Sequence, residues 1–131
     1  MNLAGLRAMF AKDVFATGLC GITIDEVTPS GARCSMPVTE KHMNSNGVVQ
    51  GGAVYTLCDT AFAVAANAGG RLTVSRSADI TYVKPGKGTR LYAEAELVSS
   101  GKSTCLCRVS VYDDQHALVA YMTGNGFVIA R

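Results

Sequence analysis

Residues 50–66 read QGGAVYTLCDTAFAVAA. Behind the two glycines nearly every side chain is apolar, so the stretch predicts a helix over about residues 51–67 that is buried on all sides. Asp59 is the only charged residue in this stretch. A buried carboxylate is costly unless it is paired, hydrogen-bonded or functional. Asp59 is therefore the first candidate for a functional residue.

Strand-like segments surround this helix on both sides. They alternate between apolar and polar side chains or are rich in β-branched residues, with Gly, Pro, Ser and Asp between them. Consecutive strands joined by short turns predict an antiparallel meander, with the apolar helix across its concave face. A short amphipathic helix is expected over about residues 2–12. The predicted strands cover residues 21–28, 32–38, 72–83, 90–98, 105–112 and 117–129.

The size and charge of the chain limit the classes of partner that we expect it to bind. Its 131 residues predict one domain over residues 1–131. The residues are 48% apolar and 17% charged, and this low charge favours association with further copies of the chain. Twelve Lys and Arg against ten Asp and Glu give a net charge of +2. The basic residues are scattered, so a nucleic-acid partner is not expected.

The cysteines indicate a reducing compartment. There are five, an odd number, and no secretory signal precedes them, so we expect reduced, buried thiols and a cytoplasmic location. Cys105 and Cys107 would lie on one face of a strand, but no second Cys or His pair stands at metal-ligand spacing, so a metal site is not expected. No uncharged apolar stretch is long enough to span a membrane, so a membrane partner is not expected. The cysteines are Cys20, Cys34, Cys58, Cys105 and Cys107.

The order of elements resembles the hotdog fold, an α+β architecture in which a curled antiparallel sheet wraps around one long central helix. The run Asn44-x-x-Gly47-x-x-Gln50-Gly51-Gly52-x-x-x-x-Leu57-x-Asp59-x-Ala61 resembles the signature of the PaaI-type acyl-CoA thioesterases. Ile80-Thr81-Tyr82-x-x-Pro85-Gly86 and Gly101-Lys102-Ser103 continue the resemblance, which covers about residues 15–130. It implies hydrolysis of an acyl-CoA thioester, with coenzyme A as part of the substrate and no separate cofactor.

The glycines and the acid could supply this chemistry. Gly51 and Gly52 would begin the helix, where backbone N–H groups lack partners and the helix dipole favours negative charge, as an oxyanion hole requires. The alternative is that they only allow close packing of helix and sheet. Asp59 would be a general base or a nucleophile. Its alternative is a carboxylate hydrogen-bonded to a neighbouring strand or subunit.

The spacing of these residues predicts a shared site. Gly51 and Asp59 are eight residues apart, about 12 Å along a helix. An oxyanion donor and a base must both lie roughly 3 Å from the reacting centre, so one helix can hardly supply both. Two antiparallel helices across a twofold axis would place Gly51 of one subunit opposite Asp59 of the other. We therefore expect a homodimer, or a dimer of dimers, and the resemblance implies the same shared site.

Three further candidate residues follow from the resemblance. Asn44 resembles the amide that holds the attacking water, unless it only stabilises its loop. Gln50 stands where the family usually has His, and an amide can donate a hydrogen bond but cannot titrate near neutrality. Ser75 resembles a hydroxyl close to the acid, with Thr73 and Ser77 as alternatives.

Basic residues near turns could bind the phosphates of coenzyme A, with Gly86 and Gly101 allowing close approach of the backbone. Each basic residue could instead be an ordinary solvated turn residue. The candidates are Arg76, Lys84, Lys87, Arg90 and Lys102.

Two other functions remain open at this point. The first is a non-catalytic module that binds acyl-CoA, because hotdog domains also serve as acyl-CoA sensors. The second is an enoyl-CoA hydratase, which would pair an acid with a histidine in the active loop. Only His42 could supply that histidine, and we expect it to be a solvent-exposed loop residue.

Overall fold

Helix α2 spans Gly51–Asn67, which confirms the predicted bounds. Gln50 caps its beginning with an extended backbone and a side chain that accepts a hydrogen bond from the Ala53 N–H. Gly70 follows its end with a φ of 90° and donates its N–H to the Asn67 carbonyl at 3.0 Å. Glycine adopts this left-handed conformation without strain, so it suits the end of a helix.

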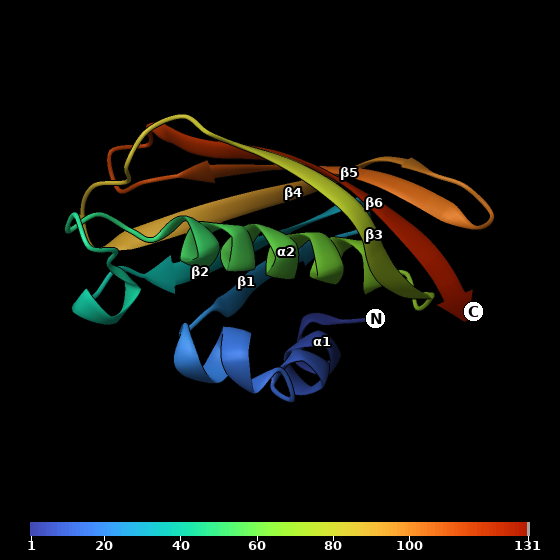
Figure 1. Cartoon of the computed structure of the whole chain (residues 1–131). Coiled ribbons are helices and arrows are strands. Elements are labelled where there is room, and N and C mark those ends of the chain that lie inside the picture. Colours follow the sequence, from blue (N-terminus) through green and yellow to red (C-terminus); the bar gives the residue numbers. More distant parts are fainter. Residues whose placement is uncertain (131) are drawn as a thin grey trace.

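Six strands form one antiparallel sheet that arches over α2 (Figure 1). The computed structural model describes residues 1–130. The long helix lies under the concave face of the curled sheet, so the predicted α+β class and its layout are confirmed. The strands are β1 (Thr23–Thr28), β2 (Gly31–Pro37), β3 (Leu72–Tyr82), β4 (Arg90–Ser100), β5 (Thr104–Tyr112) and β6 (Leu118–Ala130).

The predicted meander is wrong at one strand. The order in the sheet is β1-β2-β4-β5-β6-β3, so β4, β5 and β6 form a meander but β3 pairs with β6 instead of β4. Seven residues, 83–89, separate β3 from β4. Hairpin loops usually have two to five residues. The longer connection lets the chain cross from the edge at β3 to the free side of β2.

The core lies between α2 and the concave face of the sheet. Leu57, Phe62 and Val64 of α2 are at most 1% exposed, as are Val109 of β5 and Met122 of β6. Full burial of one such side chain contributes roughly 1.5–3 kcal/mol. The five cysteines are free and buried, as predicted.

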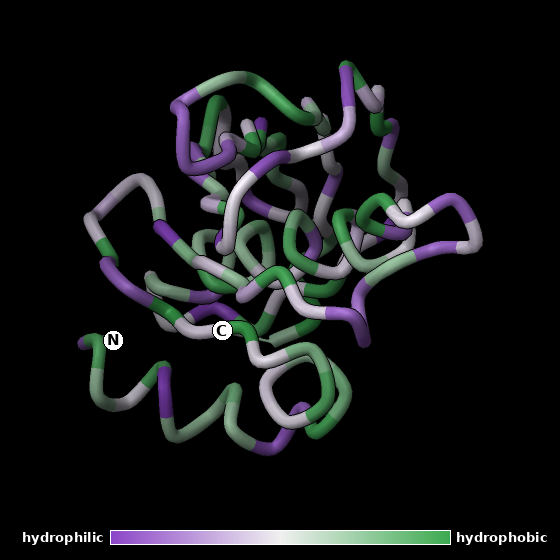
Figure 2. Tube along the Cα trace, turned by 90° about the vertical axis from the view of Figure 1, so that its left-hand side faces the viewer, coloured by the Kyte–Doolittle hydropathy of each residue, from purple (hydrophilic) through white to green (hydrophobic). Residues whose placement is uncertain are grey.

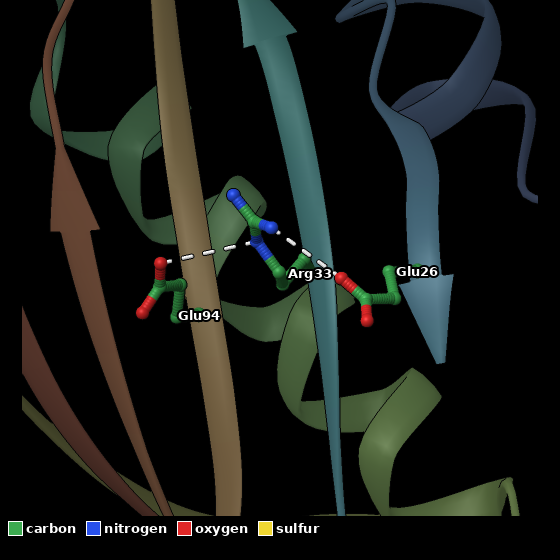
Figure 3. Close-up of polar contacts among 3 residues, drawn as sticks. All are labelled: Glu26, Arg33 and Glu94. Atoms are coloured by element: carbon green, nitrogen blue, oxygen red, sulfur yellow. Dashed lines mark hydrogen bonds and ion pairs between the residues drawn. The ribbon is translucent and has the colours of Figure 1, made fainter. Parts of the chain in front are cut away.

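The convex face of the sheet carries charged side chains. Arg33 of β2 lies between Glu26 of β1 and Glu94 of β4, with N–O distances of 3.3 and 3.8 Å (Figure 3). All three side chains are about half exposed. Ion pairs of this kind contribute little to stability because water screens them.

Two short helical segments precede the sheet at the lower edge of the molecule (Figure 1). Helix α1 spans Leu3–Phe10, inside the range expected, and its Arg7 donates two hydrogen bonds to the Ile24 carbonyl of β1. The second, η1 (Val14–Leu19), is a π-helical turn that the sequence did not predict. A third, η2 (Glu40–His42), is a 3-10 turn in the loop before α2. Among residues 1–130, no helix has the length and apolar character of a membrane span.

Candidate active site

The N-terminus of α2 presents two backbone N–H groups that are free to bind a ligand. Within the described chain, neither Gly51 N–H nor Gly52 N–H makes a hydrogen bond. The next two N–H groups, of Ala53 and Val54, donate to the Gln50 carbonyl at 2.9 and 3.2 Å. The helix dipole adds partial positive charge at this point. Gly51 and Gly52 therefore offer the donors that an oxyanion hole needs.

Both glycines also allow close packing around the start of the helix. The Tyr82 ring of β3 lies against Gly51, where a Cβ would come within 3.3 Å of it, and the Tyr82 hydroxyl donates to the Gly51 carbonyl at 2.9 Å. A Cβ at Gly52 would lie 2.6 Å from Gln50 Oε1. The packing explanation and the oxyanion explanation are therefore compatible. Tyr82 fixes the first residue of the helix, a role that the sequence did not indicate.

Asp59 lies about two turns further along α2 and is half-buried. Its carboxylate makes no hydrogen bond or ion pair with any other residue in 1–130, so no neighbouring strand of the same chain holds it. Burial raises the pKa of Asp59, and the nearby negative charge of Asp13 raises it further. A raised pKa and free oxygens suit a group that accepts a proton.

The thiol next to Asp59 does not compete for this role. Cys58 is fully buried in the core. Burial raises the pKa of the Cys58 thiol to about 12, and the charge of Asp59 adds to the effect. A thiol with such a pKa is protonated at neutral pH and is a poor nucleophile.

The sequence reasoning missed Asp13. Its side chain caps η1 by accepting a hydrogen bond from the Ala16 N–H at 3.0 Å, and its charge acts on Asp59. An Asp directly before the apolar run VFATGL is a typical helix-capping signal. That signal could have revealed the helical turn, although not the position of the turn beside α2.

Asn44 and Gln50 both have structural roles. Asn44 Oδ1 accepts hydrogen bonds from the Asn46 and Val48 N–H groups at 2.9 and 3.2 Å, so the loop-stabilising alternative is observed. Gln50 Oε1 accepts from the Ala53 N–H as the helix cap. In each side chain the amide NH₂ makes no hydrogen bond within residues 1–130 and can still donate to a bound water or carbonyl.

Ser75 and Arg76 lie on β3 and are exposed. β3 is an edge strand, because only β6 pairs with it in the described part of the chain. No hydrogen bond joins Ser75 to Asp59 within residues 1–130. The single chain therefore does not bring the predicted hydroxyl to the acid.

The predicted coenzyme A residues fall into two groups at opposite ends of the sheet. Lys84 and Gly86 follow β3 and line a cavity of about 360 Å³ together with Gly51. Gly101 and Lys102 lie in the turn between β4 and β5. The length of β4, roughly 34 Å for an extended strand of this size, separates the two groups. One chain cannot bring both groups to the same part of a ligand.

Of the two remaining basic candidates, Lys87 lies in the connection between β3 and β4, and Arg90 is the first residue of β4. Lys87 and Arg90 are near Asp113 and Asp114 of the β5–β6 turn, and the Lys87 N–H donates to Asp113 at 3.3 Å. The Arg90 guanidinium is occupied by Ser35 and Thr23 at 3.0 and 3.2 Å. The Arg90 side chain therefore has a structural role, whereas the contact of Lys87 is made by its backbone alone.

The prediction of a solvent-exposed His42 is wrong. His42 is 6% exposed. Its Nδ1 accepts from the Thr39 N–H at 3.1 Å, which leaves Nε2 to donate to the Cys20 carbonyl at 2.8 Å. The burial follows from this long-range partner, which lies 22 positions earlier in the chain. With both nitrogens occupied, His42 is unsuited to proton transfer.

Comparison with known proteins identifies the family of this chain. Residues 46–120, more than half of the chain, match the family described as the thioesterase superfamily. The chain belongs to the thioesterase superfamily. The matched residues contain both Gly51 and Asp59, as well as β3, β4 and β5. The expected enzyme class, a thioesterase, is thereby confirmed.

Relatives in this superfamily include the acyl-coenzyme A thioesterase PaaI of Escherichia coli, which is 33% identical over 120 residues, 91% of this chain and 85% of that protein. A putative esterase of Archaeoglobus fulgidus is 34% identical over 101 residues, 76% of this chain and 66% of that protein. The solved structure of the E. coli PaaI protein superimposes with a TM-score of 0.86 at 27% identity and covers 98% of this chain and 97% of that one. The predicted resemblance to PaaI-type proteins and the hotdog architecture are confirmed.

Proposed function

We propose that this thioesterase-superfamily protein hydrolyses an acyl-CoA thioester to the free acid and coenzyme A, at a site formed by two copies of the chain. The observation that carries the proposal lies on α2. Free N–H groups at Gly51 and Gly52 and an unpaired, half-buried carboxylate at Asp59 occupy one helix, about 12 Å apart.

The chemistry follows from the two groups. The Gly51 N–H of one copy binds the thioester carbonyl oxygen and stabilises the negative charge that develops on it, an effect worth roughly 3–4 kcal/mol per donor. Asp59 of the second copy removes a proton from a water that attacks the carbonyl carbon. The C–S bond then breaks, and the thiolate takes up a proton to leave as coenzyme A. A direct attack by Asp59 through a transient anhydride would give the same products.

The edge strand supports association of two copies. Leu72, Val74 and Tyr82 of β3 are 44, 43 and 50% exposed, and the outer edge of this strand has no partner within residues 1–130. An apolar, unpaired edge is a template for pairing with another chain. Pairing of β3 with β3 of a second copy would continue the sheet across a twofold axis and set the two α2 helices antiparallel, as a homodimer or as half of a dimer of dimers.

The same arrangement would complete the remaining site. Lys84 and Gly86 of one copy would bind coenzyme A beside Gly51, while Arg76, Gly101 and Lys102 would reach it from the second copy. Asn44 and Gln50 would direct their free amide groups at the water and the carbonyl, and Ser75 of β3 would lie near the shared interface. The name of the E. coli relative supports acyl-CoA as the substrate class. Five free cysteines support a cytoplasmic location.

Thiol release from a panel of acyl-CoA esters tests the proposal. We expect the protein to release coenzyme A and the Asp59→Asn variant to lose activity by at least about 100-fold, the usual scale for loss of a general base. Asp25→Asn, which changes an exposed carboxylate on β1, is the matched control and should retain activity. Failure of the wild-type protein to release thiol, or full activity of Asp59→Asn, would contradict the proposal.

A non-catalytic acyl-CoA binding module is the second candidate. Gln50 favours it, because this residue caps the helix and cannot titrate. Tight binding of acyl-CoA without hydrolysis would support the binding module over the enzyme. The enoyl-CoA hydratase has lost its support, because both ring nitrogens of His42 are occupied inside the protein.

A further inference from the structure

A second cavity borders the N-terminus of α2. Its volume is about 620 Å³, within the usual range for small-molecule sites. Gly52, Ala53 and Thr56 line it from α2, whereas Gly51 and Val54 line the cavity that contains Lys84. At about 100° per residue, these two sets lie on opposite sides of the helix. A thioester carbonyl held at the helix N-terminus would lie between the two cavities.

We propose that this second cavity binds the acyl group of the substrate, that the acyl group is an apolar alkyl or aryl chain, and that Phe15 and Leu19 determine which chain lengths are accepted. The inference rests on the proposed function, because it takes the carbonyl to be bound at Gly51. Lys84, the basic residue beside Gly51, assigns the other cavity to the coenzyme A side of the thioester.

The apolar side chains of η1 carry the argument. Phe15 and Leu19 line the cavity and are 58% and 64% exposed in the described chain. Figure 2 shows η1, next to α1, as a largely apolar coil at the lower edge of the molecule. Large apolar side chains that gather uncovered at a cavity mark a binding site. The π-helical turn also fits this role, because such turns occur frequently at functional sites.

The cavity is preformed, because hydrogen bonds hold both ends of η1, the helical turn that forms one of its walls. The buried ring of His42 joins the η2 turn to the Cys20 carbonyl at the end of η1, at 2.8 Å. The Thr17 hydroxyl donates to the Asp13 carbonyl at 2.7 Å and holds the turn from the other end. A preformed cavity binds a flexible chain with less loss of entropy than one that must assemble.

The polar atoms around the cavity select against polar acyl groups. The Thr56 hydroxyl already donates to the Gly52 carbonyl at 2.7 Å, and Gln50 Oε1 accepts from the Ala53 N–H. Both nitrogens of His42 are occupied. Lys41, an exposed residue, is the one charged residue among those that line the cavity. The free donors of the lining, the Gly52 N–H and the Gln50 amide NH₂, lie at the helix N-terminus, where the thioester carbonyl would bind. A hydroxyl or carboxylate further along the acyl chain would therefore find few free partners, at a cost in binding.

Two measurements on the full-length protein test the proposal. The first compares kcat/KM for acetyl-, butanoyl-, hexanoyl- and octanoyl-CoA. We expect a rise of about fourfold for each added methylene until the cavity is filled. The second measures by calorimetry the binding of S-octyl-CoA and S-ethyl-CoA, which cannot be hydrolysed. The wild-type protein should bind S-octyl-CoA at least about tenfold more tightly than S-ethyl-CoA.

Three variants test whether η1 causes the preference for longer acyl chains. Phe15→Ala and Leu19→Ala should each reduce the octanoyl-to-acetyl ratio and the S-octyl-to-S-ethyl ratio by about tenfold. Phe15→Trp should shift the optimum towards shorter chains. Val14→Ala is the matched control, because Val14 is 67% exposed on the same turn and does not line the cavity. It should change neither ratio.

The outcomes separate this proposal from the proposed function. Hydrolysis with no dependence on chain length, or with ratios unchanged in Phe15→Ala and Leu19→Ala, overturns the acyl cavity and leaves the thioesterase function in place. Absence of hydrolysis together with the S-octyl preference and its loss in the variants supports the cavity alone. Dissociation of the dimer by Phe15→Ala, with unchanged ratios, would assign η1 to the contact between subunits and overturn the proposal.

Discussion

Asp59 combines three properties that rarely meet in a structural carboxylate. It is half-buried, its oxygens have no partner in residues 1–130, and burial together with Asp13 raises its pKa. Because the pKa in the folded state exceeds the unfolded value, the folded protein gains stability from the protonated acid at low pH. That gain is lost as the pH rises through the raised pKa. The ionised acid therefore destabilises the fold at neutral pH.

This linkage gives a prediction at the residue scale. We expect Asp59→Asn to raise the melting temperature at pH 7, because it removes a desolvated charge, and to have a smaller effect near pH 4. Thermal unfolding of the variant and the wild-type protein at the two pH values measures the difference. Asp25→Asn on the exposed side of β1 serves as control. A variant less stable at pH 7 than at pH 4, relative to the wild-type protein, would contradict this account of Asp59.

The helix α2 and its candidate site could be predicted from residues that are close in sequence. The features that were missed depend on contacts between residues that are far apart in sequence. The helix begins at the glycine pair, with Gly51 as its first residue, and ends at Asn67, three residues before Gly70, so both signals lie at or near its ends. The burial of His42 depends on the Cys20 carbonyl, 22 positions away. The effect of Asp13 on Asp59 depends on how η1 packs against α2. A single sequence does not show such contacts.

At the scale of elements, the pairing of β3 was the main error. A short connection between β3 and β4 would have produced a hairpin, but the connection of residues 83–89 is longer than the loop of a usual hairpin. The π-helical turn η1 was missed because its closing bond, from the Cys20 N–H to the Phe15 carbonyl, spans five residues. The usual helical periodicity does not reveal such a turn.

The connection between β3 and β4 is held by two carboxylates of the β5–β6 turn. The Thr89 N–H donates to Asp114 at 2.6 Å, and the Lys87 N–H donates to Asp113 at 3.3 Å. The Thr89 N–H lowers the pKa of Asp114, and the Ala117 N–H lowers the pKa of Asp113. The stability from these depressed pKa values is present above about pH 4, the unfolded value, and is lost as the pH falls through the folded values.

A prediction at the element scale follows from these contacts. Asp114→Ala should speed amide hydrogen exchange in residues 83–89 at pH 7, because it removes the acceptor of Thr89, and it should weaken the acid dependence of unfolding below about pH 4. Exchange measured by mass spectrometry, with an acid titration followed by circular dichroism, tests both effects. The exposed Asp25→Ala change on β1 is the control. Unchanged exchange in this connection would show that Asp114 does not hold it.

At the scale of the whole molecule, the edge strand β3 is where two copies would meet. We expect Val74→Lys, at a residue 43% exposed on β3, to convert the dimer to a monomer, because a charge blocks pairing of the edge. Activity should fall by at least about 100-fold, since each site of the proposed dimer would need both copies. Size-exclusion chromatography with light scattering measures the first effect, and the thiol-release assay measures the second.

Val98→Lys is the matched control for the edge. Val98 is 49% exposed on β4, a strand inside the sheet, and lies away from the outer edge of β3. It should stay dimeric and active. Monomers that remain fully active after Val74→Lys would contradict a site shared between subunits.

Mixing two inactive variants tests the shared site most directly. Asp59→Asn removes the acid, and Gly51→Pro removes the oxyanion N–H at the first helical position, where proline fits the helix backbone. The Tyr82 ring must move slightly to admit the proline, so circular dichroism first checks that this variant is folded. After unfolding and joint refolding, half of the dimers are mixed, and each mixed dimer has one site with both groups intact. The account predicts about a quarter of the wild-type activity for the mixture, although each variant alone is inactive. A mixture as inactive as its components would place both groups in one chain and contradict it.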